Sequence, residues 1–400
     1  MRSFPFHILS TTLILYFILS VIDLFALLAL TKGKKRIRWA VIVFYTFYSV
    51  LMLFAFIYLF AYPHNASEAT GYSVYFNYDI VLIADFLVKT VLAFFSVPYF
   101  ISRLFRKRSI GFLFAGVIIS CGIIGSVITG AVIGRYQLRI QRLNLEFKDL
   151  PEAFDGFTIA QISDLHLGSY NHHTYMIGKV IKNILSLHPD MILFTGDLVN
   201  NFGKETDGWE PVFSKLNAKF GMYSILGNHD YGDYTRWKSR SLKEANLDSI
   251  VDANRKFGFR LLRNESVPII NAGDTIYLTG VENWGYPPFH QYADLTLAMK
   301  GVPAHAFKIL MTHDPAHWEA RVRDRKNIQL TLSGHTHGMQ WGLKPAGIEF
   351  SLIYFGRNSW GGLYGHEGQY LYVNRGIGTI GLNVRLDMPA EITLITLRRK

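Results

Sequence analysis

Five short blocks that combine Asp, Asn and His recur in order along the second half of this 400-residue chain. They are Asp164-Leu165-His166, Gly196-Asp197, Gly227-Asn228-His229-Asp230, Thr312-His313-Asp314 and Gly334-His335-Thr336-His337-Gly338. Each block follows an apolar run, and each contains side chains that bind a metal ion or move a proton. Imidazole and carboxylate ligands suit Zn, Fe or Mn, and the residue types alone do not choose among these metals. The set predicts a two-metal hydrolytic site.

Most of these blocks are weak evidence when they are taken singly. An Asp that follows a strand, such as Asp197, is most often a helix cap. Three polar residues directly behind an apolar run, as at Asn228, are less common, and so are the two histidines of the last block with their flanking glycines. The order and completeness of the five blocks therefore carry the prediction.

The residues between the blocks predict the elements that position them. Strands are predicted at Phe157–Ser163, Met191–Thr195, Met222–Leu226, Lys308–Thr312, Ile328–Ser333, Tyr370–Asn374 and Glu391–Leu397, with two or three more within Phe259–Glu282. Helical spacing is found at Thr174–Leu187, Glu210–Phe220 and Arg236–Lys256. Alternating strands and helices predict a layered α/β sandwich. In such a sheet, residues behind separate strands converge at the carboxyl ends, where ligands bind.

The first third of the chain has a different composition, dominated by large apolar residues. Four apolar runs, Phe6–Leu30, Trp39–Tyr62, Ile80–Leu104 and Ile110–Gly134, are each long enough to cross a bilayer. The first is too long for a signal peptide, and its basic cluster follows it instead of preceding it. We therefore expect a four-helix transmembrane domain at 1–135, a connector at 136–150 and a globular domain at 151–400. The single cysteine, Cys121, excludes a disulfide framework.

The basic residues of the loops predict the orientation of these spans. The first loop contains Lys32, Lys34, Lys35, Arg36 and Arg38, and the third contains Arg103, Arg106, Lys107 and Arg108. The second connection, 63–79, has no Lys or Arg. By the positive-inside bias, the first and third loops face the cytoplasm, so both termini and the globular domain lie outside it. Arg135, Arg139 and Arg142, just after the last span, oppose this assignment.

Charged residues inside the predicted spans are costly if they face lipid. Asp85 and Lys89 are four residues apart and can pair on one helix face. A structural ion pair within the helix bundle is the leading interpretation, with a proton relay as the alternative. The net charge of +11 is concentrated near the membrane, and no basic patch interleaved with aromatic residues is present. We expect membrane lipids as partners and no nucleic acid.

The five blocks resemble those of the calcineurin-like metallophosphoesterase superfamily, over roughly Phe157 to the C-terminus. Leu371–Gly378 and Glu391–Leu394 are similar to its membrane-associated phosphodiesterase branch, which includes enzymes that cleave UDP-diacylglucosamine. The resemblance implies a four-layer αββα sandwich and two divalent metal ions. It implies that Asp164, His166 and His337 hold one ion, and that Asn228, His313 and His335 hold the other. It also implies that Asp197 bridges both ions.

The resemblance also suggests how the reaction proceeds. Two metal ions about 3.5–4 Å apart would lower the pKa of a bridging water, and the resulting hydroxide would attack phosphorus. Asn228 would orient a phosphate oxygen. His229 is the candidate general acid for the leaving oxygen, with Asp230 as the partner that holds its ring, and a purely structural His229 is the alternative.

Three more residues are candidates for contact with substrate. Arg375, in a glycine-rich turn, could bind a phosphate bidentately, although a surface salt bridge is an equal alternative. His172 and His173 follow the first block and could line the entrance to the site, or they are ordinary exposed loop residues.

These observations predict a membrane-anchored metal-dependent phosphodiesterase or pyrophosphatase that acts on a lipid or envelope phosphate. A phosphomonoesterase or nucleotide phosphatase is the first alternative, and a non-catalytic membrane sensor or a transporter is a weaker one. Nucleotide-linked lipid precursors are made on the cytoplasmic face, so an extracytoplasmic domain favours other lipid-linked phosphates. The sequence does not specify an oligomeric state.

Overall fold

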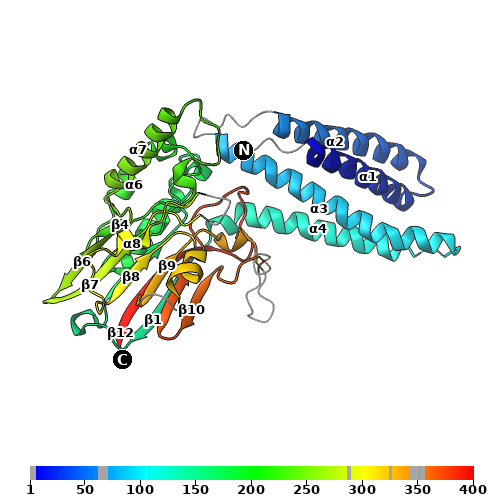
Figure 1. Ribbon diagram of the computed structural model, residues 1–400. Coiled ribbons are helices and arrows are strands. Elements are labelled where there is room, and N and C mark those ends of the chain that lie inside the picture. Colours follow the sequence, from blue (N-terminus) through cyan, green and yellow to red (C-terminus); the bar gives the residue numbers. More distant parts are fainter. Residues whose placement is uncertain are drawn as a thin grey trace. The chain divides into compact units, whose positions relative to one another are not determined.

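The computed structural model describes residues 6–61, 71–107, 109–285, 290–323, 327–342, 351 and 356–400 (Figure 1). The chain divides into two compact units. One comprises Met1–Ser67 with Tyr75–Gly130, and the other comprises Glu68–Val74 with Ala131–Lys400. The first is the apolar helical part of the chain and the second contains all five polar blocks.

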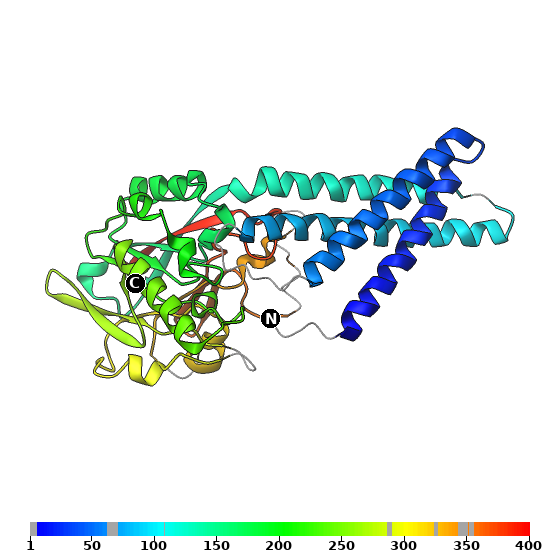
Figure 2. The same ribbon diagram turned by 90° about the horizontal axis from the view of Figure 1, so that it is seen from above.

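The first unit contains α1 (Phe6–Leu30), α2 (Lys35–Ala61) and most of α3 (Gly71–Leu104) and α4 (Gly111–Val132), four long apolar helices. All four are long and apolar enough to cross a membrane. They lie where the spans are predicted, except that α2 begins at Lys35 instead of Trp39, that α3 begins at Gly71 instead of Ile80, and that Tyr62 is outside the described residues. Figure 2 shows α1 and α2 as one helical hairpin and α3 and α4 as a second.

A polar network connects three of these helices. Asp85 of α3 accepts hydrogen bonds from the hydroxyls of Tyr16 (2.7 Å) in α1 and Tyr48 (3.0 Å) in α2. Lys89 lies 3.6 Å from Asp85 and donates to the hydroxyl of Tyr45 at 2.9 Å. Asp85 and Lys89 are both buried. The predicted pair therefore forms and is extended by tyrosines, which supports its interpretation as a structural ion pair.

The second unit contains two six-stranded sheets. In order, the first has β1 (Leu138–Phe147), β12 (Ala390–Arg399), β2 (Thr158–Ile162), β3 (Met191–Phe194), β4 (Met222–Ser224) and β5 (Arg260–Leu261). The second has β10 (Gly362–His366), β11 (Gln369–Val373), β9 (Leu330–Ser333), β8 (Lys308–Met311), β7 (Asp274–Gly280) and β6 (Glu265–Asn271). β2, β3 and β4 run parallel, and so do β7, β8, β9 and β11.

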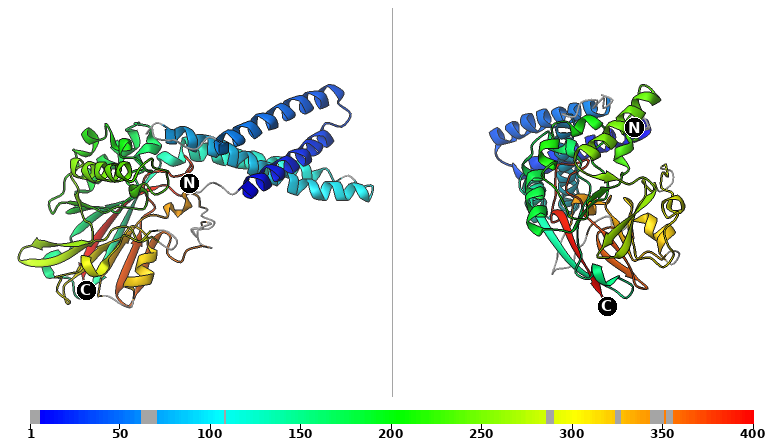
Figure 3. Two further views of the ribbon diagram at one scale, coloured as in Figure 1. Left: turned by 45° about the horizontal axis from the view of Figure 1, so that its top comes forward. Right: turned by 90° about the vertical axis from the view of Figure 1, so that its left-hand side faces the viewer.

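The two sheets pack face to face, as Figure 3 shows. Buried side chains of both sheets, such as Ile159 and Leu193 from the first and Ile309 and Leu332 from the second, form one apolar core. Burying such a side chain stabilises the fold by about 1.5–3 kcal/mol. The sheets are apolar on both faces because each also carries helices on its outer side.

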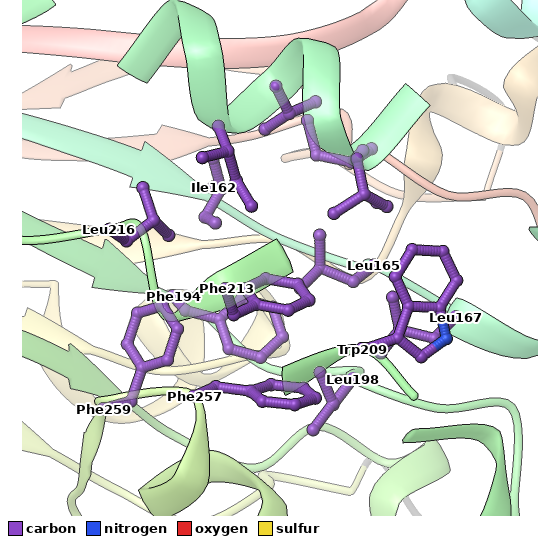
Figure 4. Packing of buried hydrophobic residues seen from close by; sticks show 14 of the residues in the cluster. Ile162, Leu165, Leu167, Phe194, Leu198, Trp209, Phe213, Leu216, Phe257 and Phe259 are labelled. Atoms are coloured by element: carbon purple, nitrogen blue, oxygen red, sulfur yellow. The ribbon is translucent and has the colours of Figure 1, made fainter. Parts of the chain in front are cut away.

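Three helices cover the outer face of the first sheet: α5 (Tyr175–Leu187), α6 (Glu210–Phe213) and α7 (Arg240–Lys256). Their side chains meet Ile162 and Phe194 of the sheet, and Phe213 stacks on Phe257 with ring centroids 4.4 Å apart (Figure 4). The short helix α8 (Leu295–Ala298) and the single turn Trp318–Val322 cover the second sheet. The result is the expected four-layer αββα sandwich.

Two local expectations were wrong, and two edge strands were missed. The 136–150 segment is not a connector, because Leu138–Phe147 forms β1 and pairs in parallel with β12. β1 and β10 are edge strands with many exposed or half-buried positions, so neither shows the apolar run of a buried strand. Helix α6 ends at Phe213 and does not reach Phe220, because Ser214 and Asn217 favour turns over helix.

The network between the apolar helices leads to a stability prediction. Asp85→Ala leaves the buried Lys89 ammonium without its paired carboxylate, and breaking a buried ion pair in this way costs about 3–5 kcal/mol. We expect a clearly lower melting temperature for the full chain in detergent. The double variant Asp85→Ala/Lys89→Met should recover part of the loss because it removes the unpaired ammonium, although Asp23, which Lys89 reaches through Tyr45, then has no cation in this network. Unchanged melting of the single variant would contradict a stabilising ion pair.

Candidate metal centre

The fold places the five polar blocks at the carboxyl ends of parallel strands in both sheets. The seven predicted metal ligands follow five strands: Asp164 and His166 follow β2, Asp197 follows β3, Asn228 follows β4, His313 follows β8, and His335 and His337 follow β9. Because the two sheets pack against each other, ligands from one sheet meet ligands from the other. Neither sheet could form this site alone.

Asp164, His166 and His337 form the first ligand group. One potential ligand atom from each of the three lies within 4.8 Å of the others. The Nε2 atoms of His166 and His337 are 3.1 Å apart, and His337 Nε2 is 3.3 Å from Asp164 Oδ1. These atoms lie close enough together to be ligands of a single ion.

Asp197, His313 and His335 form the second ligand group, which Asn228 joins. Asn228 Oδ1 lies 3.0 Å from His313 Nε2 and 2.8 Å from His335 Nδ1. His313 directs Nδ1 to the backbone carbonyl of Thr195 at 2.7 Å. Because a carbonyl only accepts, Nδ1 carries the hydrogen and Nε2 is the nitrogen that faces the group.

Asp197 lies between the two groups. Its Oδ2 atom is 3.1 Å from His313 Nε2 and 3.6 Å from His166 Nε2. A carboxylate in this place can contribute to two neighbouring ion sites. All seven predicted ligands are thus brought together, and the individual role of each in binding metal stays a proposal.

The buried part of this centre attracts positive charge. Asp164 and Asp197 are 0% and 1% exposed, and among the described residues their ion-pair contacts are with histidines. Burial alone would raise the pKa of Asp197, but His313 and His229 hold it well below its ordinary value. Burial opposes the charged form of His313, yet Asp197 and Asp164 raise its pKa to about 10. Divalent cations can supply the positive charge that these buried carboxylates require, so the set of carboxylate, imidazole and amide donors fits two metal ions.

Five of the seven predicted ligands have an unusual backbone conformation. The φ angles of Asp164 (52°), His166 (43°), Asp197 (61°), His335 (73°) and His337 (51°) are all in the left-handed region. This region costs a non-glycine residue about 1–3 kcal/mol, and such strain concentrates at functional sites. It turns the chain sharply after each strand, so the side chains point back over the sheet ends. The predicted tight turns at His335 and His337 therefore involve the histidines themselves.

Two glycines allow the loops behind β3 and β4 to approach closely. A Cβ atom on Gly196 would lie 2.6 Å from the backbone nitrogen of Gly227, and one on Gly227 would lie 2.1 Å from Asp197 Oδ1. Both contacts are impossibly short. The glycines of the Gly-Asp and Gly-Asn-His-Asp blocks are therefore needed to seat Asp197 beside Asn228.

His229 is oriented by residues other than the one expected. Its Nδ1 lies 2.7 Å from the carbonyl of Asn200, so that nitrogen carries a hydrogen and Nε2 can exchange a proton. Tyr234 stacks on its ring at 4.4 Å and accepts a hydrogen bond from Asn228 Nδ2 at 2.7 Å. Burial lowers the pKa of His229, with Asp197 opposing the shift. The negative charge of a bound phosphate would raise it again.

Asp230 does not hold the ring of His229, contrary to expectation. Its Oδ2 accepts the backbone N–H groups of Asp197 (3.0 Å) and Gly227 (2.9 Å). Its Oδ1 accepts those of Leu198 (2.9 Å) and Val199 (3.2 Å). Burial, followed by the charge of Asp197, raises the pKa of Asp230 to about 7. Asp230 thus ties the two ligand-bearing loops together, because four converging N–H groups outcompete one imidazole for its oxygens.

The three residues predicted to contact substrate do not join the ligand groups in the structure. Arg375 is buried and pairs with Glu391 at 2.6 Å, and its turn packs against Asp164, where Ile377 N–H donates to the carbonyl of Ser163. His172 and His173 are exposed in the turn before α5. We do not propose them as phosphate ligands.

Several residues around the centre were missed in the sequence. Arg357 contacts both His335 and Asp314. Glu205 accepts backbone N–H groups from Gly168 and from residues 200–202, which links the loops behind β2 and β3. Tyr234 and Arg357 have no fixed spacing from the motifs, so no pattern could identify them. A Glu shortly after Gly-Asp was a weak signal that could have found Glu205.

The contacts of Asp230 generate a prediction. In Asp230→Asn only one side-chain oxygen remains, so two of the four buried backbone N–H groups face an amide NH₂ instead of an acceptor. Each N–H group left without an acceptor costs about 1–3 kcal/mol. We expect the free energy of unfolding to fall by about 2–4 kcal/mol in chemical denaturation. We also expect Mn²⁺ affinity, measured by calorimetry, to fall about tenfold or more. Asp248→Asn, on the exposed side of α7, is the matched control. Wild-type stability and metal affinity in Asp230→Asn would exclude this role.

Comparison with known proteins identifies relatives with similar sequences. The metallophosphoesterase YkuE of Bacillus subtilis is 30% identical over 306 residues, which cover 74% of this chain and 97% of the relative. The UDP-2,3-diacylglucosamine pyrophosphatase LpxG of Chlamydia trachomatis is 29% identical, covering 64% of this chain and 88% of the relative. A transmembrane protein with a metallophosphoesterase domain from Danio rerio is 26% identical, covering 65% of this chain and 57% of the relative.

Residues 157–339 match the calcineurin-like phosphoesterase family, and this range contains every predicted metal ligand. The four candidate spans and the transmembrane relative together indicate a membrane protein. The chain belongs to the calcineurin-like phosphoesterase family and is a metal-dependent phosphoester hydrolase with a site for two divalent metal ions.

Proposed function

We propose that this protein is a membrane-anchored phosphodiesterase or pyrophosphatase that acts on a lipid-linked or envelope phosphate. The observation that carries the proposal is the pair of ligand groups joined by Asp197, in a chain that also has four apolar helices. A phosphomonoesterase would use the same centre, so the choice between monoesters and diesters depends on the groups around it.

The side chains of the centre have separable parts in this reaction. Two divalent ions, when bound, supply Lewis-acid charge to a phosphate and an activated water. The Nδ2 atom of Asn228 donates to Tyr234, which directs Oδ1 toward the second ligand group. His229 keeps Nδ1 on the Asn200 carbonyl, so Nε2 is placed to give a proton to a leaving oxygen. Asp230 acts through the backbone and holds Asp197 in place.

A lipid-linked substrate is supported from two directions. One relative is by name a UDP-2,3-diacylglucosamine pyrophosphatase, and that substrate carries acyl chains. Within the second unit, the first turn of α3 and the turn that follows α4 contact loops of the site. Tyr72 receives a hydrogen bond from Asn201 at 2.7 Å, and Arg135 donates to the carbonyl of Ser169 at 3.2 Å. Tethering of this kind raises the local concentration of an amphiphilic substrate.

The multi-pass topology with an extracytoplasmic catalytic domain is part of the proposal. It rests on the basic first and third loops. Arg135, which opposed it, is 9% exposed and stacks on Tyr136 and Tyr170 of the domain. Arg139 lies in β1. Because these arginines belong to the folded domain, they count less as loop charges. An outside domain favours envelope phospholipids and lipid-linked phosphates over nucleotide-linked lipids.

A substrate screen tests the proposed reaction. The Mn-loaded full chain in detergent is incubated with lipid and nucleotide diesters, pyrophosphates and monoesters, and released phosphate or alcohol is measured. We expect the highest kcat/KM for a lipid-linked diester or pyrophosphate. Asp197→Asn should lower it at least about a hundredfold, since even groups that only support a metal ligand are worth about 10–100-fold.

Asp207→Asn provides the matched control for that screen, because Asp207 is an exposed carboxylate on a loop of the same domain. It should retain wild-type turnover. Equal turnover by Asp197→Asn would eliminate the two-metal mechanism. A preference for monoesters would replace the proposed diesterase with a phosphomonoesterase.

A reporter experiment tests the orientation. A phosphatase reporter that matures only outside the cytoplasm, fused after Lys400, should be active, whereas a fluorescent reporter that folds only inside should be dark. The same reporters fused after Gly33, in the basic first loop, should give the opposite result. Fluorescence from the Lys400 fusion would place the domain in the cytoplasm and make nucleotide-linked lipids the better substrates.

A further inference from the structure

Arg357 brings a positive charge to the edge of the second ligand group. Its Nη1 atom lies 2.6 Å from Asp314 Oδ1, and its Nη2 atom lies 3.1 Å from His335 Nε2. The Arg357 side chain is 30% exposed, whereas that of Asp314 is 4% exposed. A buried carboxylate therefore holds a partly exposed guanidinium against a predicted metal ligand.

The open side of the centre is the side on which Arg357 lies. His166 and His313 are fully buried, whereas Asn228, His229 and His335 are half-buried. A substrate must therefore approach across these half-buried side chains. Arg357 contacts His335, so its guanidinium lies along this approach.

The two nitrogens of His335 have different surroundings. Nδ1 faces Asn228 Oδ1 at 2.8 Å and His313 Nε2 at 3.3 Å, so it is the nitrogen directed at the ligand group. Nε2 faces Arg357 and lies 3.7 Å from Asp314 Oδ2. When Nδ1 gives its lone pair to an ion, a neutral imidazole carries its hydrogen on Nε2. Its natural acceptor is the Asp314 carboxylate, as for most metal-bound histidines.

A guanidinium has only donors and cannot bond to that Nε2–H group. Arg357 Nη2 then needs another acceptor, while Nη1 stays on Asp314. We propose that this acceptor is a phosphate oxygen of the substrate, so that Arg357 is a phosphate-binding residue and Asp314 its positioning residue. The inference rests on the proposed phosphoesterase function and deepens it. The planar fork of arginine suits phosphate oxygens, and its bonds to them are charge-assisted.

Asp314 has two acceptor oxygens for these two donors. Oδ1 holds Arg357, and Oδ2 is on the side of His335. The carboxylate thus couples the orientation of a metal ligand to that of the phosphate-binding residue. Arg375, which was the sequence-based candidate for this part, is instead buried against Glu391.

Calorimetry with inorganic phosphate tests the proposal on the Mn-loaded full chain in detergent. Arg357→Gln should weaken phosphate binding about tenfold or more, because a hydrogen bond to a charged group is lost. Arg357→Lys should be intermediate, since it keeps the charge and loses the fork. Bound manganese, measured by elemental analysis, should be unchanged in both. Arg240→Gln, on the exposed surface of α7, is the matched control and should bind phosphate as the wild type does.

Two displacement arms identify the source of the phosphate group. Phosphate bound to the protein is displaced either by phosphatidylglycerol in the same micelles or by a water-soluble diester, bis(4-nitrophenyl) phosphate. Arg357→Gln should raise the dissociation constant of each displacing diester, calculated after correction for the weaker binding of phosphate itself. Stronger displacement by the lipid would identify a lipid headgroup as the preferred ligand.

Asp314→Asn tests the positioning role through a double-variant comparison of phosphate affinity. General destabilisation would not make the effects of the two substitutions non-additive. If Asp314 acts through Arg357, the double variant Asp314→Asn/Arg357→Gln binds phosphate no more weakly than Arg357→Gln alone when both are compared at full manganese content. Additive losses would remove Asp314 from this role.

Wild-type phosphate affinity in Arg357→Gln with full metal content would overturn the proposal. Loss of manganese from both Arg357 variants would also overturn it, because Arg357 would then support His335 only. These binding experiments do not depend on turnover. A wild-type protein that binds phosphate through Arg357 but hydrolyses no ester would refute the proposed function and leave this inference standing.

Discussion

The structure of the catalytic domain depends on one buried carboxylate, that of Asp197. Its Oδ2 lies between His313 and His166, and its Oδ1 accepts the backbone N–H of His229 at 2.9 Å. A buried charge is tolerated only where it is paired and hydrogen-bonded. The surrounding loops meet this requirement by bringing histidines from both sheets and the backbone N–H of His229, from the loop behind β4, to one carboxylate. Metal binding follows from the same need for positive charge.

The strain around Asp197 is compensated by the rest of the fold. Left-handed backbone at the ligands is unfavourable, and it persists because the loops are fixed from several sides. Asp230 joins the loops behind β3 and β4, and Glu205 joins those behind β2 and β3. Arg385, which is 1% exposed, donates to the carbonyls of Gly376 and Gly378 and fixes the turn beside Asp164. Buried charges of both signs thus replace secondary structure where the chain is irregular.

The apolar helices obey the same rule in a different environment. Asp23 of α1 is fully buried and accepts a hydrogen bond from Tyr45 of α2 at 3.3 Å, and Tyr45 in turn accepts one from Lys89 of α3. Polar groups in lipid must find partners within the protein, so such a network selects one packing of the helices. In both units, therefore, a few buried ionisable residues determine how apolar elements fit together.

The sequence by itself determined the chemistry: the five ordered blocks behind apolar runs predicted the seven candidate ligands that the fold brings together and the hydrolytic class, and run length predicted the four candidate spans. Local signals suffice for these because ligand identity and strand or helix periodicity are written in neighbouring residues. Only the tertiary structure decided what holds and surrounds the ligands. Arg357, Tyr234 and Glu205 reach the centre from loops without fixed spacing, while Arg375 and Asp230 were drawn into buried structural contacts. Edge strand β1 was also missed, because it lacks the apolar run of a buried strand, and its pairing with β12, about 250 positions away, is decided only by the tertiary structure.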